Sequence, residues 1–401
     1  MKQVLLDLKT GKILVDEVPT PALKRRGVLV RNHYSVVSAG TELSLIKFAK
    51  RNILLKARER PDLAKKVIEK AKRDGWLIAL QQAMRRLEKP MPLGYSSAGE
   101  VIKVSPDIID IKPGDRVVPV CDVPCGTCYT CRFTYGYVAW CERAFCYGTT
   151  RSCKEPPHLY GGWSQLMYIH PDTLLFKVAG GIAPEIAVLT EPFAVAYGAY
   201  MKAMQPCSPV LDIHGYSPGD NVVILGPGPI GLIHAIMARI IGAGDVIVVG
   251  AGSEADEWRV SYIEKEFKNV VDYTVNLPSP EERVKEVFKL TGGRGADLVV
   301  ECAGVPEAIV DGLKMLKDKG GTLLVVGVFI DLSRDIKFNP ATLISHKNAR
   351  IIGISNHPLQ GYEKAFRLMR KYGEKLSFRK IVTHIFPLEE AQEAMDTAIK
   401  G

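Results

Sequence analysis

The chain has 401 residues, of which 47% are hydrophobic and 24% are charged. It is too long for a single hydrophobic core, so two domains are expected, and its composition excludes a disordered protein. No apolar run reaches the roughly 18 residues of a membrane-spanning helix, and the start lacks the apolar stretch of a signal peptide, so we expect a cytoplasmic protein. The whole net charge of +9 comes from residues 44–90, which hold 14 Lys and Arg against 5 Asp and Glu. An anionic partner would therefore meet this segment first.

Short β-rich runs punctuated by Pro and Gly fill residues 1–37, a pattern typical of antiparallel sheet. Similar runs return from Met91 to the turn at residues 112–117, and again at residues 161–178. These segments predict a domain built mainly of antiparallel strands.

Residues 43–90 are basic and have helical periodicity, with a break at Asp74-Gly75. The pattern predicts a helical hairpin, preceded by a helix over residues 43–57. Two apolar faces support it, Leu63, Ala64, Val67 and Ala71 on one, and Trp76, Leu77, Leu80, Ala83, Met84 and Leu87 on the other. The leading interpretation is a charged solvent face over a packed apolar stripe. Alternatives are a subunit contact, a lid or a docking surface for an anionic substrate. Nucleic acid is less favoured, because aromatic residues for base stacking are nearly absent.

The most informative stretch is residues 221–243. Asn221 to Leu225 is a short apolar run that predicts a buried parallel strand, and Pro229 to Ile241 predicts a helix. Between them, Gly226, Gly228 and Gly231 have G-x-G-x-x-G spacing. In such a loop the first glycine permits a tight turn, the second lets backbone amides approach a pyrophosphate, and the third lets helix and strand pack closely. The pattern predicts a dinucleotide site at a helix N-terminus.

Further strands are expected at residues 245–249, 297–300 and 322–328, with helices at 281–290 and 306–317 between them. This alternation predicts a βαβ series with a parallel sheet. A strand near 349–355, a helix over 361–371 and a final helix over 388–399 complete the chain.

The motifs PLGYSSAGEV, KPGDRVV, CGTCYTC, LTEPFAVAYGA, GPGPIG, TGGRGADLVVECAG and FPLEEAQEAMDTA follow one another along nearly the whole chain. In order and spacing the chain resembles the medium-chain dehydrogenase/reductase superfamily, in its branch of zinc-containing alcohol, sorbitol and threonine dehydrogenases. The resemblance implies a GroES-like catalytic domain from residues 1–192 and 341–401, with the helical insertion at 43–90 and a zinc lobe at 121–153. It implies a Rossmann domain over 193–340, hydride transfer to or from a nicotinamide, and a homodimer or homotetramer.

Seven of the nine cysteines lie within residues 121–153. Because no export signal is present, metal binding explains them better than a disulfide framework. The spacing Cys125-x2-Cys128-x2-Cys131, with Cys141 as fourth ligand, predicts a closed tetrahedral structural zinc site. The gap before Cys141 is two residues longer than the family's, so Cys146 is the substitute ligand. Free thiols or an iron–sulfur cluster are the alternatives.

The ligands of the family's catalytic zinc are missing. Ala39 stands where the zinc enzymes have a cysteine, and Tyr95 and Ser96 replace their His and Glu. Only Glu191 matches a position where some relatives keep a carboxylate near the metal, and one carboxylate will not hold zinc. The segment SAGTE with its basic insertion resembles zinc-lacking members of the superfamily. We therefore expect no catalytic zinc.

Another group must then stabilise or protonate the oxygen that hydride transfer leaves negative. The candidates are Thr41, which matches the family's relay hydroxyl, Glu42 beside it, Tyr95 and Glu191. Our hypothesis is that Tyr95, with Thr41, donates the proton. The alternative is that Tyr95 only fills the space left by the metal. The eight histidines show no ligand spacing such as H-x3-H and are expected to be loop or packing residues.

Gly250 stands where NAD enzymes usually have an acidic residue for the ribose hydroxyls, and Ser253 and Arg259 are near enough to bind a 2'-phosphate. This favours NADP over NAD, unless Glu254 or Asp256 takes over the ribose. The candidate cofactor-binding residues are Gly226, Gly228, Pro229, Ile230, Gly231, Gly250, Ser253, Arg259, Gly327 and Val328. The leading expectation is an NAD(P)-dependent oxidoreductase acting on a carbonyl or alcohol, with structural zinc only. A zinc-dependent alcohol or polyol dehydrogenase with atypical ligands, and a nicotinamide-binding regulator without enzymatic activity, are the alternatives.

Overall fold

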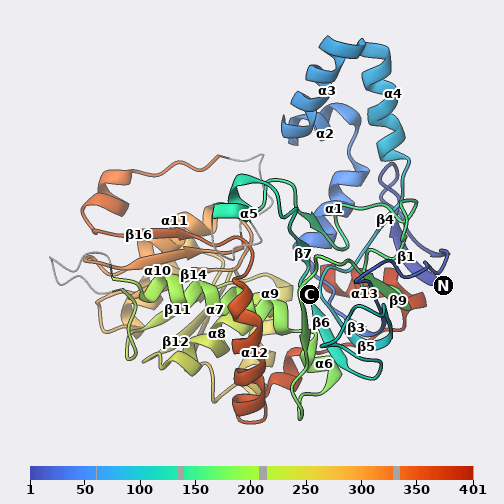
Figure 1. The fold of residues 1–401 in the computed structure, drawn as a ribbon. Coiled ribbons are helices and arrows are strands. Elements are labelled where there is room, and N and C mark those ends of the chain that lie inside the picture. Colours follow the sequence, from blue (N-terminus) through green and yellow to red (C-terminus); the bar gives the residue numbers. More distant parts are fainter. Residues whose placement is uncertain (60, 134–139, 207–214, 328–334, 401) are drawn as a thin grey trace. The chain divides into compact units, whose positions relative to one another are not determined.

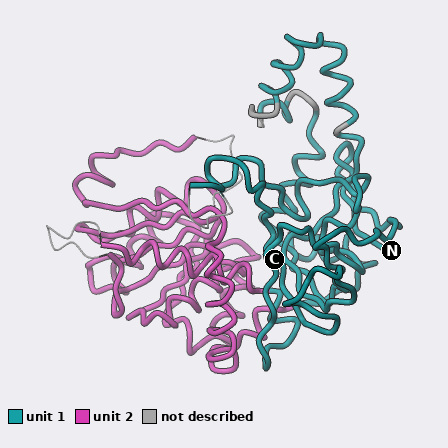
Figure 2. The backbone as a smooth tube through the Cα atoms, in the orientation of Figure 1, with its two compact units in different colours: residues 1–188, 384–399 teal, residues 189–383, 400–401 magenta. Residues whose placement is uncertain are grey.

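The structure is a computed structural model, and it describes residues 1–59, 61–133, 140–206, 215–327 and 335–400. The chain forms two compact units (Figure 2). Unit 1 contains Met1–Val188 and His384–Ile399, and unit 2 contains Leu189–Thr383 and Lys400–Gly401. No helix among the described residues is long and apolar enough to span a membrane.

Unit 1 is built mainly of antiparallel strands in three sheets, as predicted. A three-stranded sheet has the order β2-β1-β4 and a five-stranded sheet the order β10-β6-β5-β3-β9, while β7 and β8 pair separately. Val4, Leu6, Met91 and Leu93 form part of one hydrophobic core, which also takes in Met395 near the end of the chain. The strands are β1 (Lys2–Leu6), β2 (Ile13–Glu17), β3 (Val28–Ser35), β4 (Met91–Pro92), β5 (Ser97–Val104), β6 (Arg116–Pro119), β7 (Asp122–Val123), β8 (Phe145–Cys146), β9 (Leu166–Ile169) and β10 (Leu175–Lys177).

The helices of unit 1 gather in the basic insertion. Four follow one another there, α1 (Thr41–Lys50), α2 (Ile53–Glu59), α3 (Pro61–Asp74) and α4 (Trp76–Leu87). The predicted hairpin is confirmed, because α3 and α4 pack side by side around the turn at Gly75, whose φ is 89° (Figure 1). The packed stripe predicted on α4 is wrong: Trp76, Leu77, Leu80 and Met84 are exposed, and the small Ala79 is buried instead. The remaining helices are α5 (Tyr129–Phe133), α6 (Pro184–Ala187), the 3-10 turn at Leu388–Glu390 and α13 (Ala391–Lys400), which begins in unit 1.

Unit 2 is a six-stranded parallel sheet in the order β13-β12-β11-β14-β15-β16, the strand order of a Rossmann fold. Its central strands are buried from end to end because helices cover a parallel sheet on both faces. The strands are β11 (Val222–Leu225), β12 (Val246–Gly250), β13 (Tyr273–Asn276), β14 (Leu298–Glu301), β15 (Thr322–Val325) and β16 (Arg350–Gly353). The predicted fold class, an antiparallel GroES-like domain plus a doubly wound Rossmann domain with a helical insertion, is confirmed.

Helices of unit 2 connect these strands, as the βαβ pattern predicts. They are α7 (Thr190–Met204), α8 (Pro229–Ile241), α9 (Glu254–Glu266), α10 (Pro280–Leu290), α11 (Glu307–Met315), the π-helical turn at Ala341–Ser345, α12 (Leu359–Tyr372) and the 3-10 turn at Phe378–Ile381. Helix α12 packs closely on α7, where a Cβ on Gly361 would lie 2.8 Å from the Cβ of Ala194.

The predicted domain boundary at residue 341 needs correction. Strand β16 pairs with β15 along its whole length, from Arg350 opposite Thr322 to Gly353 opposite Val325. Residues 341–383 therefore complete the parallel sheet of unit 2, and the chain returns to unit 1 only at His384. The periodicity of 349–355 identified a strand, but nothing in a short strand says which sheet it joins.

Candidate functional site

The glycine loop of unit 2 has the geometry that its spacing predicts. Gly226 directly follows β11 and has a φ of 102°, and a Cβ there would come within 2.9 Å of the Ala303 amide nitrogen. A Cβ on Gly231 would lie 2.0 Å from the carbonyl oxygen of Gly226, so only glycine lets α8 sit this close to the turn. A Cβ on Gly228, by contrast, would meet no described atom within 4 Å. The middle glycine therefore faces open space, as a close approach of phosphate requires.

The N-terminus of α8 opens at this loop. Pro229 is its first residue and Gly228 its extended N-cap, and no side chain of the described chain caps it. The amides of Ile230 and Gly231 consequently lack intrahelical acceptors. Together with the positive end of the helix dipole they suit a pyrophosphate. The residues present thus fit a dinucleotide.

The loop after β12 determines which ribose could be accommodated. A Cβ on Gly250 would lie 2.5 Å from Oδ1 of Asn276, so a larger residue would displace this side chain from its hydrogen bond with the Gly252 amide. The carboxylate of Asp256 is turned inward, where Oδ2 accepts a hydrogen bond from the Ala251 amide at 2.8 Å. Its other oxygen lies 3.7 Å from the guanidinium of Arg259. Ser253 is exposed, and its Oγ accepts a hydrogen bond from the Asp256 amide as the N-cap of α9.

A buried carboxylate joins two loops at the carboxyl ends of neighbouring strands. Glu301, the last residue of β14, is fully buried, and its two oxygens accept hydrogen bonds from the amides of Gly304 at 2.8 Å and Gly327 at 3.0 Å. A Cβ on Gly327 would lie 2.7 Å from the Gly304 amide nitrogen, and Gly304 itself has a φ of 73°. Gly327 therefore has a structural reason to be glycine, and Val328 lies outside the described residues.

A second buried carboxylate in unit 2 has a histidine partner. Glu191 lies in the first turn of α7, and its Oε1 is 3.3 Å from Nδ1 of His357, without a hydrogen bond between them. Both side chains are buried, and the ring of Tyr362 packs edge-on against His357 with centroids 4.9 Å apart. His357 follows the carboxyl end of β16, the edge at which parallel sheets bind ligands. His357 thus lies in a loop and packs beside Tyr362, as expected of the histidines, but a carboxylate stands next to it.

The four predicted zinc ligands come together in unit 1. The sulfurs of Cys125, Cys128, Cys131 and Cys141 all lie within 4.8 Å of one another, and those of Cys128 and Cys141 are 3.8 Å apart. Tetrahedral zinc with bonds of about 2.3 Å needs sulfurs separated by about 3.8 Å, so the group fits this metal.

The backbone supports thiolates in this lobe. Amides of Cys125, Cys128 and Cys131 donate to the sulfurs of Cys141, Cys125 and Cys128, at 3.2, 3.4 and 3.5 Å. The amide and hydroxyl of Thr127 lower the pKa of Cys125 to about 5. Cys146, the substitute ligand, lies instead in a separate group with Cys121 and Asp122.

The candidate acid–base residues of unit 1 lie at two loops. Glu42 is buried, and its carboxylate accepts a hydrogen bond from the Ser38 amide at 2.9 Å, while the Ser38 hydroxyl accepts one from the Thr41 amide at 3.2 Å. The pair is a reciprocal cap that fixes the start of α1. Thr41 is half-buried at this helix end, and Ala39 is exposed.

Tyr95 occupies a tightly packed loop before β5. Gly94 precedes it with a φ of 87°, and Ser96 follows with its hydroxyl donating to the carbonyl of Val188 at 2.9 Å. A Cβ on Gly148 would lie 2.8 Å from the Tyr95 amide nitrogen, so the loop that contains Gly148 packs directly against the backbone of Tyr95. The Tyr95 ring is half-buried.

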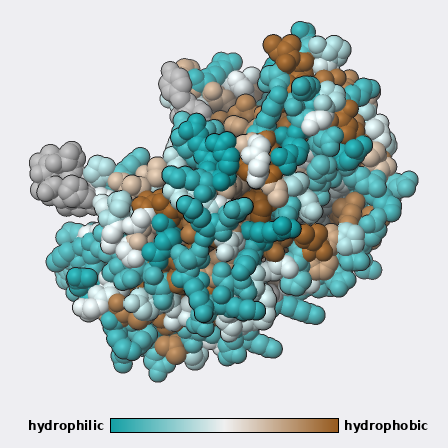
Figure 3. Space-filling model, turned by 90° about the horizontal axis from the view of Figure 1, so that it is seen from below, coloured by the Kyte–Doolittle hydropathy of each residue, from teal (hydrophilic) through white to brown (hydrophobic). Residues whose placement is uncertain are grey.

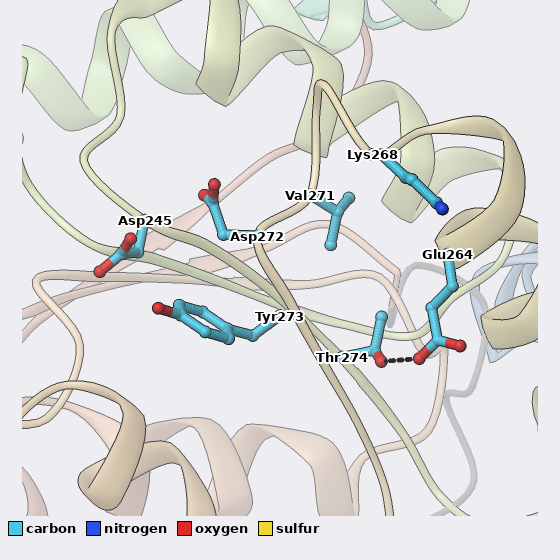
Figure 4. Close-up of a pocket in the computed structure, with 7 residues that line it drawn as sticks. All are labelled: Asp245, Glu264, Lys268, Val271, Asp272, Tyr273 and Thr274. Atoms are coloured by element: carbon cyan, nitrogen blue, oxygen red, sulfur yellow. Dashed lines mark hydrogen bonds between the residues drawn. The ribbon is translucent and has the colours of Figure 1, made fainter.

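A hollow of about 400 Å3 lies at the opposite edge of the parallel sheet (Figure 4). It lies where β12 and β13 begin, at the edge away from the carboxyl ends that hold the glycine loop. Asp272 accepts a hydrogen bond from the Val246 amide at 2.8 Å and pairs with Arg239, and Thr274 donates to Glu264. We assign it no role in cofactor binding. The face of the molecule in Figure 3 is mainly hydrophilic, with hydrophobic residues in scattered groups.

Comparison with known proteins agrees with this geometry. Residues 71–179 match the alcohol dehydrogenase GroES-like domain and residues 229–371 the zinc-binding dehydrogenase domain. The chain is 30% identical to L-threonine 3-dehydrogenase of Pyrococcus furiosus over 80% of its length and 82% of that protein. It is 29% identical to L-arabinitol 4-dehydrogenase of Aspergillus oryzae, over 76% of this chain and 74% of the relative.

Among solved structures, an alcohol dehydrogenase from Thermotoga maritima aligns with a TM-score of 0.75 and 26% identity, covering 99% of this chain and 96% of the other. The second matched domain runs to residue 371, in agreement with the corrected boundary of unit 2. The chain therefore belongs to the medium-chain dehydrogenase/reductase superfamily, among its alcohol dehydrogenase-like, NAD(P)-dependent oxidoreductases.

Proposed function

We propose that the protein transfers a hydride between NADP(H) and a carbonyl or secondary alcohol, keeps a structural zinc and works without a catalytic zinc. The observation that carries this proposal is the chemistry at the family's zinc positions. Ala39 has no donor atom, and the Ser96 hydroxyl is committed to the Val188 carbonyl. Tyr95 is a poor zinc ligand.

Nicotinamide, when bound, supplies or accepts the hydride. The glycine loop and the amides at the start of α8 would hold its pyrophosphate. Arg259 and Ser253 would bind a 2'-phosphate, since Gly250 carries no acid and the carboxylate of Asp256 already accepts a hydrogen bond from the Ala251 amide. We therefore propose that NADPH binds more tightly than NADH.

Tyr95, assisted by Thr41, is the proposed proton donor to the substrate oxygen. Glu42 serves as a positioning residue, because its carboxylate holds the loop before Thr41 in place. We expect Tyr95→Phe to lower kcat by about 100-fold with little change in KM. Full turnover by this variant would refute the acid role and favour the view that the ring only fills space.

A second candidate, zinc-dependent dehydrogenation with atypical ligands, is favoured by one observation. Glu191 and His357 bring a carboxylate and an imidazole within 3.3 Å in a buried place, and zinc binds both groups. If these side chains ligate a catalytic zinc, the chain carries two zinc ions rather than one.

The deciding experiment combines a substrate screen with metal analysis. Carbonyl compounds and polyols are tested with both nicotinamides, following absorbance of the reduced ring, and zinc per chain is measured in the parent, His357→Asn and Cys141→Ser. One zinc in the parent, retained by His357→Asn and lost from Cys141→Ser, supports the first proposal. Two zinc ions, one lost from each variant, support the second, and binding of neither nicotinamide contradicts both.

The proposed substrate class rests on the hydride-transfer chemistry and on the substrates for which the relatives are named. Relatives are named for arabinitol, sorbitol and threonine, each a polar molecule with a secondary alcohol. We propose a polar polyol or its carbonyl counterpart as the substrate, a homodimer or homotetramer as the assembly, and the cytoplasm as the compartment.

A further inference from the structure

The turn between α3 and α4 exposes three consecutive large apolar side chains. Trp76, Leu77 and Ile78 are 61%, 72% and 46% exposed and form the first turn of α4, directly after Gly75. Single exposed apolar residues are common on proteins, but a contiguous group at a protruding turn marks a contact surface.

The exposed group continues along α4 as a stripe. Leu80 and Met84 are also exposed, and they follow Trp76 at intervals of four residues, so all three share one face of the helix. Helices α3 and α4 pack together, and the buried residues described in the pair are the small Ala71 on α3 and Ala79 on α4. The hairpin therefore buries two alanines and leaves Trp76, Leu77, Ile78, Leu80 and Met84 exposed.

The hairpin that carries this stripe is also basic. Lys65, Lys66, Lys72, Arg73 and Arg85 are exposed on the same two helices. They belong to the segment 44–90 that holds the whole net charge of the protein. The surface thus combines a large apolar stripe with excess positive charge.

Charge and chemistry select one occupant. A second copy would bring an equally positive hairpin against this one, and the two would repel each other. Nucleic acid would satisfy the charges but not the stripe, in which only Trp76 can stack on a base. An anionic bilayer satisfies both, because its head groups attract Lys and Arg while Trp and aliphatic side chains enter the interface.

We propose that the α3–α4 hairpin docks the protein on the surface of an anionic phospholipid bilayer, with Trp76, Leu77 and Ile78 entering the interface. This contact is peripheral and does not depend on the dehydrogenase reaction. It places the enzyme beside lipid, at the cytoplasmic leaflet if the chain is cytoplasmic.

The test is flotation of the full-length protein with vesicles of phosphatidylcholine, alone or with one third phosphatidylglycerol. We expect binding to the anionic vesicles only, weakened by added salt. The double variant W76S/L77S should bind at least about tenfold more weakly. The triple variant K65Q/K66Q/K72Q should bind about 100-fold more weakly, since each basic residue contributes roughly a fivefold factor.

Ile109→Ser is the matched control, because Ile109 is 96% exposed elsewhere in unit 1 and its loss should leave binding unchanged. Phospholipids brominated in their acyl chains should quench tryptophan fluorescence in the parent and less in Trp76→Phe, and circular dichroism verifies that each variant is folded. No binding to anionic vesicles, or equal binding by folded W76S/L77S, overturns the proposal. So does tighter binding to an RNA oligonucleotide than to vesicles, or a dimer that W76S/L77S dissociates.

Discussion

Replacing His234 by leucine should stabilise the protein, and more so in acid. His234 lies on α8 and is 1% exposed, and neither ring nitrogen has a hydrogen-bond partner among the described residues. The ring of Tyr200 lies beside it, with centroids 5.9 Å apart. Burial lowers the pKa of His234 from 6.5 to about 3, so the folded protein keeps this ring neutral.

The sign of the pH effect follows from proton linkage. Between pH 6.5 and about 3 the unfolded chain binds a proton at His234 that the folded chain does not bind, so the free energy of unfolding decreases as pH decreases. At pH 5 the unfolded state gains about 2 kcal/mol from this proton, and at pH 7.5 almost nothing. His234→Leu also removes two unpaired buried nitrogens, which should raise the free energy of unfolding by about 1–3 kcal/mol at either pH. The different shape of leucine should lower it by up to about 1.5 kcal/mol.

The measurement is thermal unfolding of parent and His234→Leu at pH 7.5 and pH 5. We expect the Tm advantage of the variant to be larger at pH 5 by about 4–8 °C, as a 2 kcal/mol change gives in a unit of this size. His346→Leu, at an exposed histidine of unit 2, should show no such difference and serves as control. An equal Tm advantage at both pH values would refute the reasoning, because it would mean that folding does not hold His234 neutral.

Other predictions concern the cofactor loop and the metal lobe. Gly228→Ala should fold with an unchanged Tm, since its Cβ meets no described atom, but bind NADPH at least about tenfold more weakly. Gly231→Ala should weaken NADPH binding and also lower the Tm, because its Cβ would lie 2.0 Å from a carbonyl oxygen. Equal Tm values for Gly231→Ala and the parent would contradict this. Arg259→Gln should weaken NADPH about tenfold by calorimetric titration and leave NADH unchanged. Cys141→Ser should lose the structural zinc and have a lower Tm, whereas Cys146→Ser should retain the zinc and the Tm of the parent. The reverse result would assign the fourth ligand to Cys146.

Much of the fold follows from local patterns. The run at 221–225 and the glycines after it specify a strand, a turn and a helix, and the structure places β11, Gly226 and α8 there. Apolar periodicity predicted two helices and a turn at Gly75. It could not predict that the largest apolar residues of α4 are exposed to solvent. Periodicity measures where apolar residues lie on a helix and not what covers them.

The candidate site was predictable where ligand spacing is local. Cys125, Cys128 and Cys131 lie within one short loop, so their spacing already constrains the sulfurs, and Cys141 joins them despite the longer gap. The inward turn of Asp256 was not predictable, because it depends on hydrogen bonds to loop amides that only the folded backbone presents.

The pairing of Glu191 with His357 shows why distant residues escape a search for spacing. One lies at the start of α7 and the other after β16, and no interval along the chain relates them. Packing of α12 on α7 brings the segments together, and the left-handed Asn356, with a φ of 60°, directly precedes the histidine. A buried carboxylate beside a buried imidazole can hold a metal or move a proton, so the zinc content of His357→Asn separates the two proposed chemistries.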